Sequence, residues 1–171
     1  MGAPRLAIRI VGFALNPHGI AFAVVEDADR LLECGSRKPA SRSVTGAIEE
    51  VLERYRPLFV ACEMGRTSHR SARARQFEDA LLSVCAERGL MILCVERTRL
   101  VAEGLRYPTN YEISLAAAER FPKIGRRLPT KRRLWEGAND SIGVFLAAAA
   151  AAAGWDHFRR NRTSSPVNMR M

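Results

Sequence analysis

The sequence predicts one α/β domain built on a mixed five-stranded sheet with helices on both faces. Three short apolar runs follow one another near the start of the chain without an amphipathic segment between them. Two further apolar runs are each preceded by a segment whose apolar residues recur at helical spacing. Strands joined by tight turns pair antiparallel, whereas strands joined through helices pair parallel. We therefore expect the order β-β-β-α-β-α-β-α-α, with three antiparallel strands followed by two parallel ones.

The five expected strands are residues 6–15, 20–26, 30–36, 58–64 and 89–96. The first two form a hairpin, because residues 15–19 between them (LNPHG) have turn chemistry. Asn16 is interpreted as a turn former. The fourth strand, LFVACEM, is apolar except for Glu63, which is typical of a parallel strand buried on both faces. Glu63 is therefore unusual in its surroundings.

The four expected helices are residues 43–57, 68–89, 109–121 and 139–155. Thr109 followed by Glu112 three residues later predicts a capping box at the start of the third helix. Asn139 or Asp140 is expected to cap the last helix, whose alanine run allows close approach to the sheet. From Asp156 onward the chain is polar, basic and without pattern. The domain is thus expected to span residues 1–155, and residues 156–171 to form a flexible basic tail.

The charge of the chain points to a polyanionic partner. It has 27 Lys and Arg residues against 18 Asp and Glu residues, a formal net charge of +9. No basic amphipathic anchor is visible, and the apolar run at 144–153 is too short to span a bilayer, so nucleic acid is favoured over a membrane. The four cysteines form no CxxC pair, which is typical of buried thiols in a reducing compartment. A cytoplasmic location is expected.

Four segments resemble the RuvC group of Holliday-junction resolvases, within the ribonuclease H-like superfamily. They are VGFALNPHGIAFAVV (11–25), YRPLFVACEMG (55–65), RTRLVAEGLRYPTNYEISLAAAERF (97–121) and NDSIGVFLAAAAAA (139–152). The resemblance covers roughly residues 6–155 and rests on the order and spacing of these segments. It implies a ribonuclease H-like fold, a nucleic-acid partner, most simply DNA, and a homodimer as one allowed assembly.

The resemblance also implies where a two-Mg²⁺ nuclease site would lie. Such sites use clustered carboxylates to hold the ions. The family supplies an Asp on the first strand, a Glu on the fourth, and two acids near the start of the last helix. Glu63 and Asp140 match two of these and are the implied metal ligands, while Ala14 and Gly137 stand at the other two positions. With Glu136 as a further catalytic candidate in the preceding loop, the set would hold at most one weakly bound Mg²⁺.

Two of these acids have alternative interpretations. Glu63 is either a site carboxylate or the partner of an arginine from the following loop. Asp140 is either a ligand or simply a helix cap. Glu26 cannot replace the missing first-strand acid, because at strand rise it lies roughly 17 Å further along the hairpin than Ala14.

Two basic segments, residues 66–75 and 126–135, flank the expected site. They predict contacts with phosphates, although charged segments of this kind also form solvated faces. Tyr107 is a further candidate, for stacking on a base. The expected nucleic-acid-binding residues are Arg66, Arg70, Arg73, Arg75, Arg126, Arg127, Lys131, Arg132, Arg133 and Tyr107.

The sequence therefore favours a protein that recognises structured or branched nucleic acid through arginine-rich loops and has weak or lost nuclease activity. The missing first-strand acid supports this hypothesis. An active Mg²⁺-dependent, structure-selective endonuclease with a remodelled site is the alternative, supported by Glu63 and Asp140. A structural component of a larger assembly is the second alternative.

Overall fold

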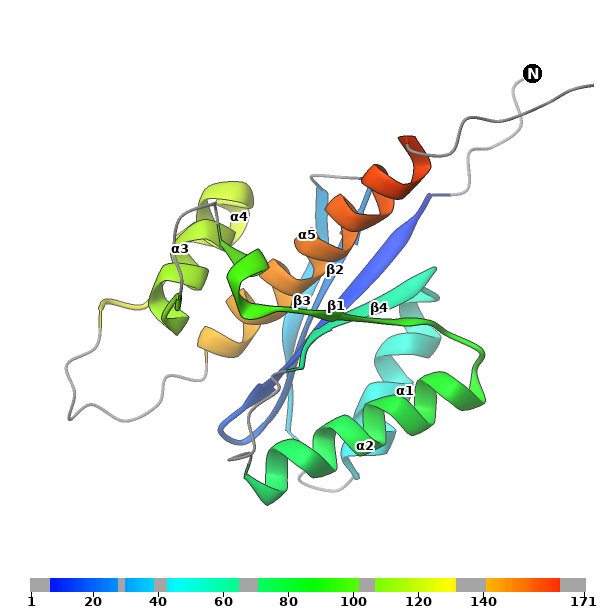
Figure 1. The fold of residues 1–171 in the computed structure, drawn as a ribbon. Coiled ribbons are helices and arrows are strands. Elements are labelled where there is room, and N and C mark those ends of the chain that lie inside the picture. The colour runs from blue at the N-terminus through cyan, green and yellow to red at the C-terminus, as the bar shows by residue number, and fades with distance from the viewer. Residues whose placement is uncertain are drawn as a thin grey trace, which may run out of the picture.

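The computed structural model describes residues 7–27, 30–38, 43–64, 71–101, 107–131 and 141–163. Its centre is a five-stranded sheet with the order β3-β2-β1-β4-β5 (Figure 1). The pairs β1–β2 and β2–β3 are antiparallel, and the pairs β1–β4 and β4–β5 are parallel. The expected mixed sheet is confirmed. The strands are β1 (Arg9–Asn16), β2 (Gly19–Glu26), β3 (Arg30–Arg37), β4 (Phe59–Glu63) and β5 (Ile92–Val95).

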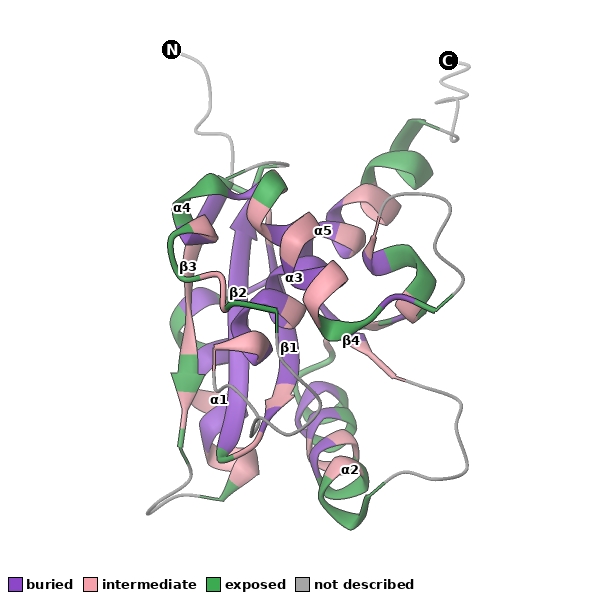
Figure 2. Cartoon of the chain, turned by 90° about the vertical axis from the view of Figure 1, so that its left-hand side faces the viewer, coloured by how far each residue is buried: buried purple, intermediate pink, exposed green. Residues whose placement is uncertain are grey.

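Helices cover both faces of the sheet, as expected (Figures 1 and 2). Two helices lie on one face, namely α1 (Val44–Tyr55) and α2 (Ala72–Glu87). The other face carries α3 (Asn110–Arg120), the short α4 (Pro122–Gly125) and the long α5 (Ile142–Thr163). A 3-10 turn, η1 (Arg97–Leu100), follows β5. The capping box of Thr109 and Glu112 at the start of α3 is present.

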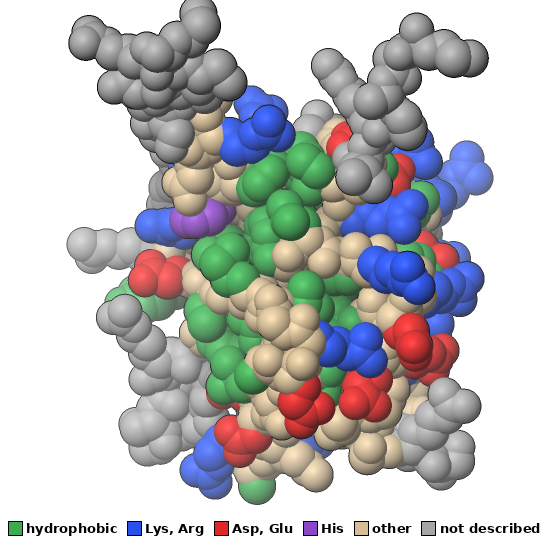
Figure 3. All heavy atoms as spheres, turned by 90° about the vertical axis from the view of Figure 1, so that its right-hand side faces the viewer, with side chains coloured by type: hydrophobic (Ala, Val, Ile, Leu, Met, Phe, Trp, Pro, Cys, Tyr) green, Lys and Arg blue, Asp and Glu red, His purple; other side chains and the backbone are tan. Residues whose placement is uncertain are grey.

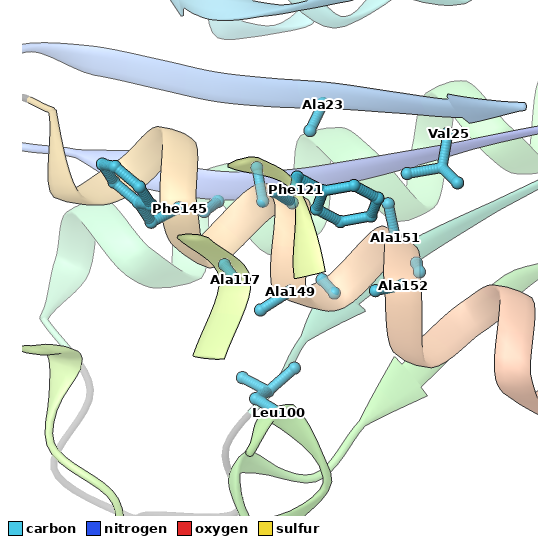
Figure 4. Packing of buried hydrophobic residues seen from close by; sticks show 14 of the residues in the cluster. Ala23, Val25, Leu100, Ala117, Phe121, Phe145, Ala149, Ala151 and Ala152 are labelled. Atoms are coloured by element: carbon cyan, nitrogen blue, oxygen red, sulfur yellow. The ribbon is translucent and has the colours of Figure 1, made fainter. Parts of the chain in front are cut away.

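The alternation of side chains along β1 creates two separate hydrophobic cores. Val11 and Phe13 pack with α1 and α2, whereas Ile10 and Ala14 pack with the alanines of α5. Figure 4 shows α5 alanines beside Phe121 and Val25 in this second core. Gly12 permits the close approach of α5, because a Cβ there would lie 2.0 Å from the carbonyl oxygen of Ala147. The alanine run therefore serves packing, as expected.

The expected flexible tail is wrong for residues 156–163, which continue α5. Two aromatic residues three positions apart explain the longer helix. Trp155 is buried, and the Phe158 ring lies 5.6 Å from the Trp155 ring and 6.2 Å from the Phe59 ring. Asp156 adds an ion pair of 2.7 Å with Arg120 on α3. These contacts hold the helix against the domain as far as Phe158, and residues 159–163 continue it as an exposed end.

Asn16 is more than the turn former that the sequence suggested, because it precedes the two-residue turn of Pro17 and His18 and is also buried. Asn16 is the last residue of β1, pairs with Gly19, and is 4% exposed. Its amide nitrogen donates a hydrogen bond of 2.8 Å to Ser36 Oγ on β3. Its amide oxygen points at the first turn of α5, since a Cβ at Gly143 would lie 1.7 Å from it. Asn16 is therefore buried between the sheet and α5, and its amide oxygen has no hydrogen-bond partner among the described residues.

The expected burial of the cysteine thiols is found at two of the four positions. All four cysteines are unpaired by disulfides, and Cys62 and Cys85 are buried. Cys94 is exposed, because β5 is an edge strand. Within the described part of the chain, every helix is too short or too polar to cross a membrane.

Candidate functional site

The site is built where β1 and β4 end side by side. The last pair between these parallel strands joins Phe13 to Cys62, so the next step along both strands brings Ala14 beside Glu63. Ala14 is 8% exposed. The glutamate at the end of β4 thus has Ala14, on the central strand β1, as its neighbour in the register.

Glu26 lies at the opposite end of the hairpin, as the sequence predicted. It pairs across the hairpin with Arg9, and its carboxylate forms a 2.9 Å ion pair with the Arg9 Nε. Its other oxygen contacts Arg30 at 3.2 Å. These bonds hold Glu26 in the sheet, far from Glu63.

The carboxylate of Glu63 is bound by Arg97. The Nη1 of Arg97 lies 2.9 Å and 3.1 Å from the two carboxylate oxygens. Both side chains are partly accessible, with 24% of the Glu63 side chain and 35% of the Arg97 side chain exposed. Bonds between two ionised groups are the strong class of hydrogen bond. Of the two interpretations of Glu63, the arginine-paired one is the geometry observed.

The arginine comes from η1 after β5, and not from the loop after β4 that the sequence suggested. β5 runs parallel to β4, and Val95 pairs with Glu63. Arg97 is two residues beyond Val95, so its side chain reaches back over the end of β4. The pattern that could have revealed it is an arginine just after the neighbouring parallel strand, because the carboxyl ends of parallel strands meet at one edge.

Arg97 is held from three directions. Its Nε donates a 2.7 Å hydrogen bond to the carbonyl oxygen of Pro108, and its Nη2 donates to Asn110 Oδ1. Pro108 and Asn110 flank the first residue of the capping box at the start of α3. The guanidinium therefore ties the end of β4 to the start of α3.

The described residues do not fit a Mg²⁺ ion. Mg²⁺ demands near-octahedral oxygen coordination and is usually bound through carboxylates and substrate phosphate. Both oxygens of Glu63 are engaged by Arg97, and Ala14 has none to offer. Within the ranges that the structure describes, no group of three or more His, Cys, Asp or Glu side chains could hold a metal. Asp140 and Glu136, the other implied acids, lie outside the described residues.

A hollow of about 430 Å³ opens beside the Glu63–Arg97 pair. It lies between Arg97, the start of α3, residues 129–131 and Ile142, the first residue of α5. Lys131, one of the expected binding residues, lines it. This hollow brings together four segments that are far apart in the chain.

The remaining expected binding residues are distributed over more than one surface. Arg73 turns back onto the hairpin and donates to the carbonyl oxygens of Asn16, Pro17 and Gly19. Arg75 and Tyr107 are exposed, and so are Arg126 and Arg127. Arg66, Arg70, Arg132 and Arg133 lie outside the described residues.

Arg127 belongs to the β3 side of the molecule and not to the hollow. Burial raises the pKa of the Cys34 thiol on β3, and the nearby charges of Arg127 and Lys123 oppose this rise.

The face drawn in Figure 3 carries Lys and Arg side chains mixed with Asp and Glu side chains around an apolar band. The net positive charge is therefore not gathered on that face.

No protein-family model matches this sequence, and no curated protein matches it either. Solved structures do. Thermus thermophilus RuvC in complex with a Holliday junction substrate superposes with a TM-score of 0.64 and 19% identity, over 90% of this chain and 96% of that one. The fowlpox virus resolvase in complex with Holliday junction DNA gives a TM-score of 0.56 and 12% identity, over 86% and 99% of the two chains. The chain therefore has the ribonuclease H-like fold of the RuvC and poxvirus resolvases.

Proposed function

We propose that this protein binds structured or branched nucleic acid, most simply DNA, and that it has weak or no nuclease activity. The observation that carries this proposal is the state of Glu63, whose carboxylate is bound by Arg97 and whose strand neighbour is Ala14. The net charge of +9 supports a polyanionic partner. Two of the structures with the same fold contain Holliday junction DNA, which supports a branched substrate.

Fast cleavage is disfavoured by the chemistry of the site. Metal-assisted hydrolysis of a phosphodiester needs carboxylates that hold the ions against the attacking and leaving oxygens. A metal at Glu63 would have to displace, or share the carboxylate with, a guanidinium that makes two hydrogen bonds to it. It would then find no oxygen on Ala14. Binding of the nucleic acid needs neither step.

An active endonuclease is the second candidate, and one observation favours it. Ile142, which lines the hollow beside Arg97, follows Asp140 by two residues in the sequence. An acid from this segment could join Glu63 if Arg97 moved away on substrate binding. Under this alternative, Asp140 and Glu136 would be catalytic together with Glu63.

The two candidates are separated by measuring binding and cleavage on the same substrate. The probes are a fluorescein-labelled four-way DNA junction and linear duplexes of the same arms, with anisotropy for binding and a denaturing gel for cleavage. We expect preference for the junction in both Mg²⁺ and chelator, with cleavage at background. Brisk cleavage that Glu63→Gln abolishes would establish the endonuclease instead. Failure to bind any of the DNAs at low salt would refute both and leave an assembly partner.

A further inference from the structure

The guanidinium of Arg97 is held in place by the protein and still has an N–H group that can donate a hydrogen bond. A guanidinium carries five N–H groups. Nε donates to Pro108, Nη1 faces the two oxygens of Glu63, and Nη2 donates one bond to Asn110. The second hydrogen of Nη2 has no partner among the described residues, and the side chain lines the hollow. Its conformation is already fixed, so little side-chain entropy is lost when a ligand binds.

The hollow has the chemistry of an anion site. Its described lining carries two cations, Arg97 and Lys131, and no carboxylate. Thr109, Thr130 and Tyr111 add hydroxyl groups. The other two hollows nearby differ, since each is lined by Asp156 and by a glutamate as well as by arginine. Of these three, this hollow alone lacks a described acid.

Its size and apolar parts suit one nucleotide. A volume of about 430 Å³ lies within the range of small-ligand sites. Ile142, Pro129 and the ring of Tyr111 supply apolar surface for a sugar or a base. The start of α3 is not the anchor, because Thr109 and Glu112 already cap each other's backbone N–H groups. The side chains of Arg97 and Lys131 are the cations of the lining. The Lys131 charge also lies near the Glu112 carboxylate, whose pKa is lowered mainly by hydrogen bonds with Thr109 and further by Lys131.

We infer that Arg97 binds a backbone phosphate of the nucleic acid in this hollow, assisted by Lys131, and that it replaces a metal ion as the cation between Glu63 and the phosphate. The inference rests on the proposed function and gives it a metal-independent anchor. Because the Glu63–Arg97 pair is neutral as a whole, the carboxylate partly cancels the attraction for phosphate. Removal of the Glu63 charge should therefore strengthen binding, whereas at a metal-bridged site it would weaken binding.

The first test compares Arg97→Gln with Arg99→Gln. Arg99 lies in the same 3-10 turn and carries the same charge, but it lines the two other hollows. In chelator, Arg97→Gln should weaken junction binding about five- to ten-fold and lower the log–log salt slope by about one. Arg99→Gln should change the affinity less than about two-fold. Equal effects of the two variants would overturn the inference, because net charge alone would then explain them.

The second test uses Arg97→Lys and Glu63→Gln, with thermal unfolding as the folding control. Arg97→Lys keeps the charge and should retain most of the salt slope. Glu63→Gln should bind the junction several-fold more tightly, equally in chelator and in millimolar Mg²⁺. Weaker binding of Glu63→Gln, or wild-type binding that chelator abolishes, would overturn the inference.

A third measurement separates this inference from the proposed function. Thymidine 3′,5′-bisphosphate is titrated into the ¹⁵N-labelled protein. We expect shifts of the Asn110 and Lys131 amides in the wild type and in Arg99→Gln, but not in Arg97→Gln. These shifts would support the anion site even if the junction assay failed. Junction binding without them, or shifts that persist in Arg97→Gln, would overturn the site and leave the proposed function standing.

Discussion

Replacement of Ala14 by aspartate places a second carboxylate beside Glu63. Neighbouring strands lie about 4.8 Å apart, so the two carboxylates would be about 6 Å apart. At an effective dielectric constant near 20, their repulsion is about 3 kcal/mol. Ala14 is 8% exposed, so loss of hydration adds to this cost, while the charge of Arg97 offsets part of it. We expect the free energy of unfolding at pH 7 to fall by about 2–3 kcal/mol and Tm by about 5–10 °C.

The pH dependence of this loss has a defined sign. Repulsion by the Glu63 charge raises the folded-state pKa of the introduced aspartate above its unfolded value near 4. The penalty is therefore present at neutral pH and fades as the pH falls toward 4. Thermal unfolding followed by circular dichroism at pH 7 and pH 5 measures it, with the uncharged isostere Ala14→Asn as the matched control. Equal Tm values for Ala14→Asp and Ala14→Asn at pH 7 would show that position 14 does not face Glu63.

Magnesium then tests the role of Arg97. In Ala14→Asp alone, Arg97 still binds Glu63, so millimolar Mg²⁺ should recover little of the lost stability. In the double variant Ala14→Asp, Arg97→Gln both carboxylates are available, and we expect Mg²⁺ to raise Tm and weak cleavage of a four-way junction to appear. Arg97→Gln alone is the baseline. If the single variant Ala14→Asp recovers and cleaves as well as the double variant, Arg97 does not obstruct metal binding.

Three further predictions concern the fold. Gly12→Ala should lower the free energy of unfolding by about 3 kcal/mol, because the added Cβ would lie 2.0 Å from the backbone of α5. Denaturant titration measures this loss, and Gly125→Ala is the control because a Cβ there has no neighbour closer than 3.8 Å. Arg73→Gln should lower Tm more than Arg75→Gln, since Arg73 donates hydrogen bonds to the hairpin carbonyls. The salt slope of junction binding should not change in Arg73→Gln, and a reduced slope would instead assign Arg73 a phosphate contact. Burial raises the pKa of Cys85 to about 11. The unfolded thiol therefore ionises first, and stability should fall between about pH 9 and pH 11 in wild type but less in Cys85→Ala, as urea midpoints would show.

The resemblance implied that Ala14 and Glu63 end neighbouring strands, but it did not reveal the partner of Glu63. The register of β1 and β4 ends with Phe13 beside Cys62, so one further step places Ala14 next to Glu63, in agreement with the strand order. The partner of Glu63 was placed on the loop after β4, whereas Arg97 comes from 34 residues further along the chain. The spacing of residues within one segment carries no information about which side chain reaches it from another. Strand order and the length of the arginine side chain decide that contact.

Local patterns in the sequence determined the five strands, the opening hairpin and the capping box at Thr109, because alternation, helical spacing and turn chemistry act between residues a few positions apart. The type of connection between successive strands, by a turn or through a helix, determined the mixed sheet. Only the tertiary structure decided the pairing of Arg97 with Glu63, the burial of Asn16 against α5, and the hollow beside Lys131. It also decided the length of α5, which continues past Asp156 because Phe158 finds an aromatic partner on β4. Each of these depends on contacts between segments that are distant in sequence, which form only when the sheet brings the segments together.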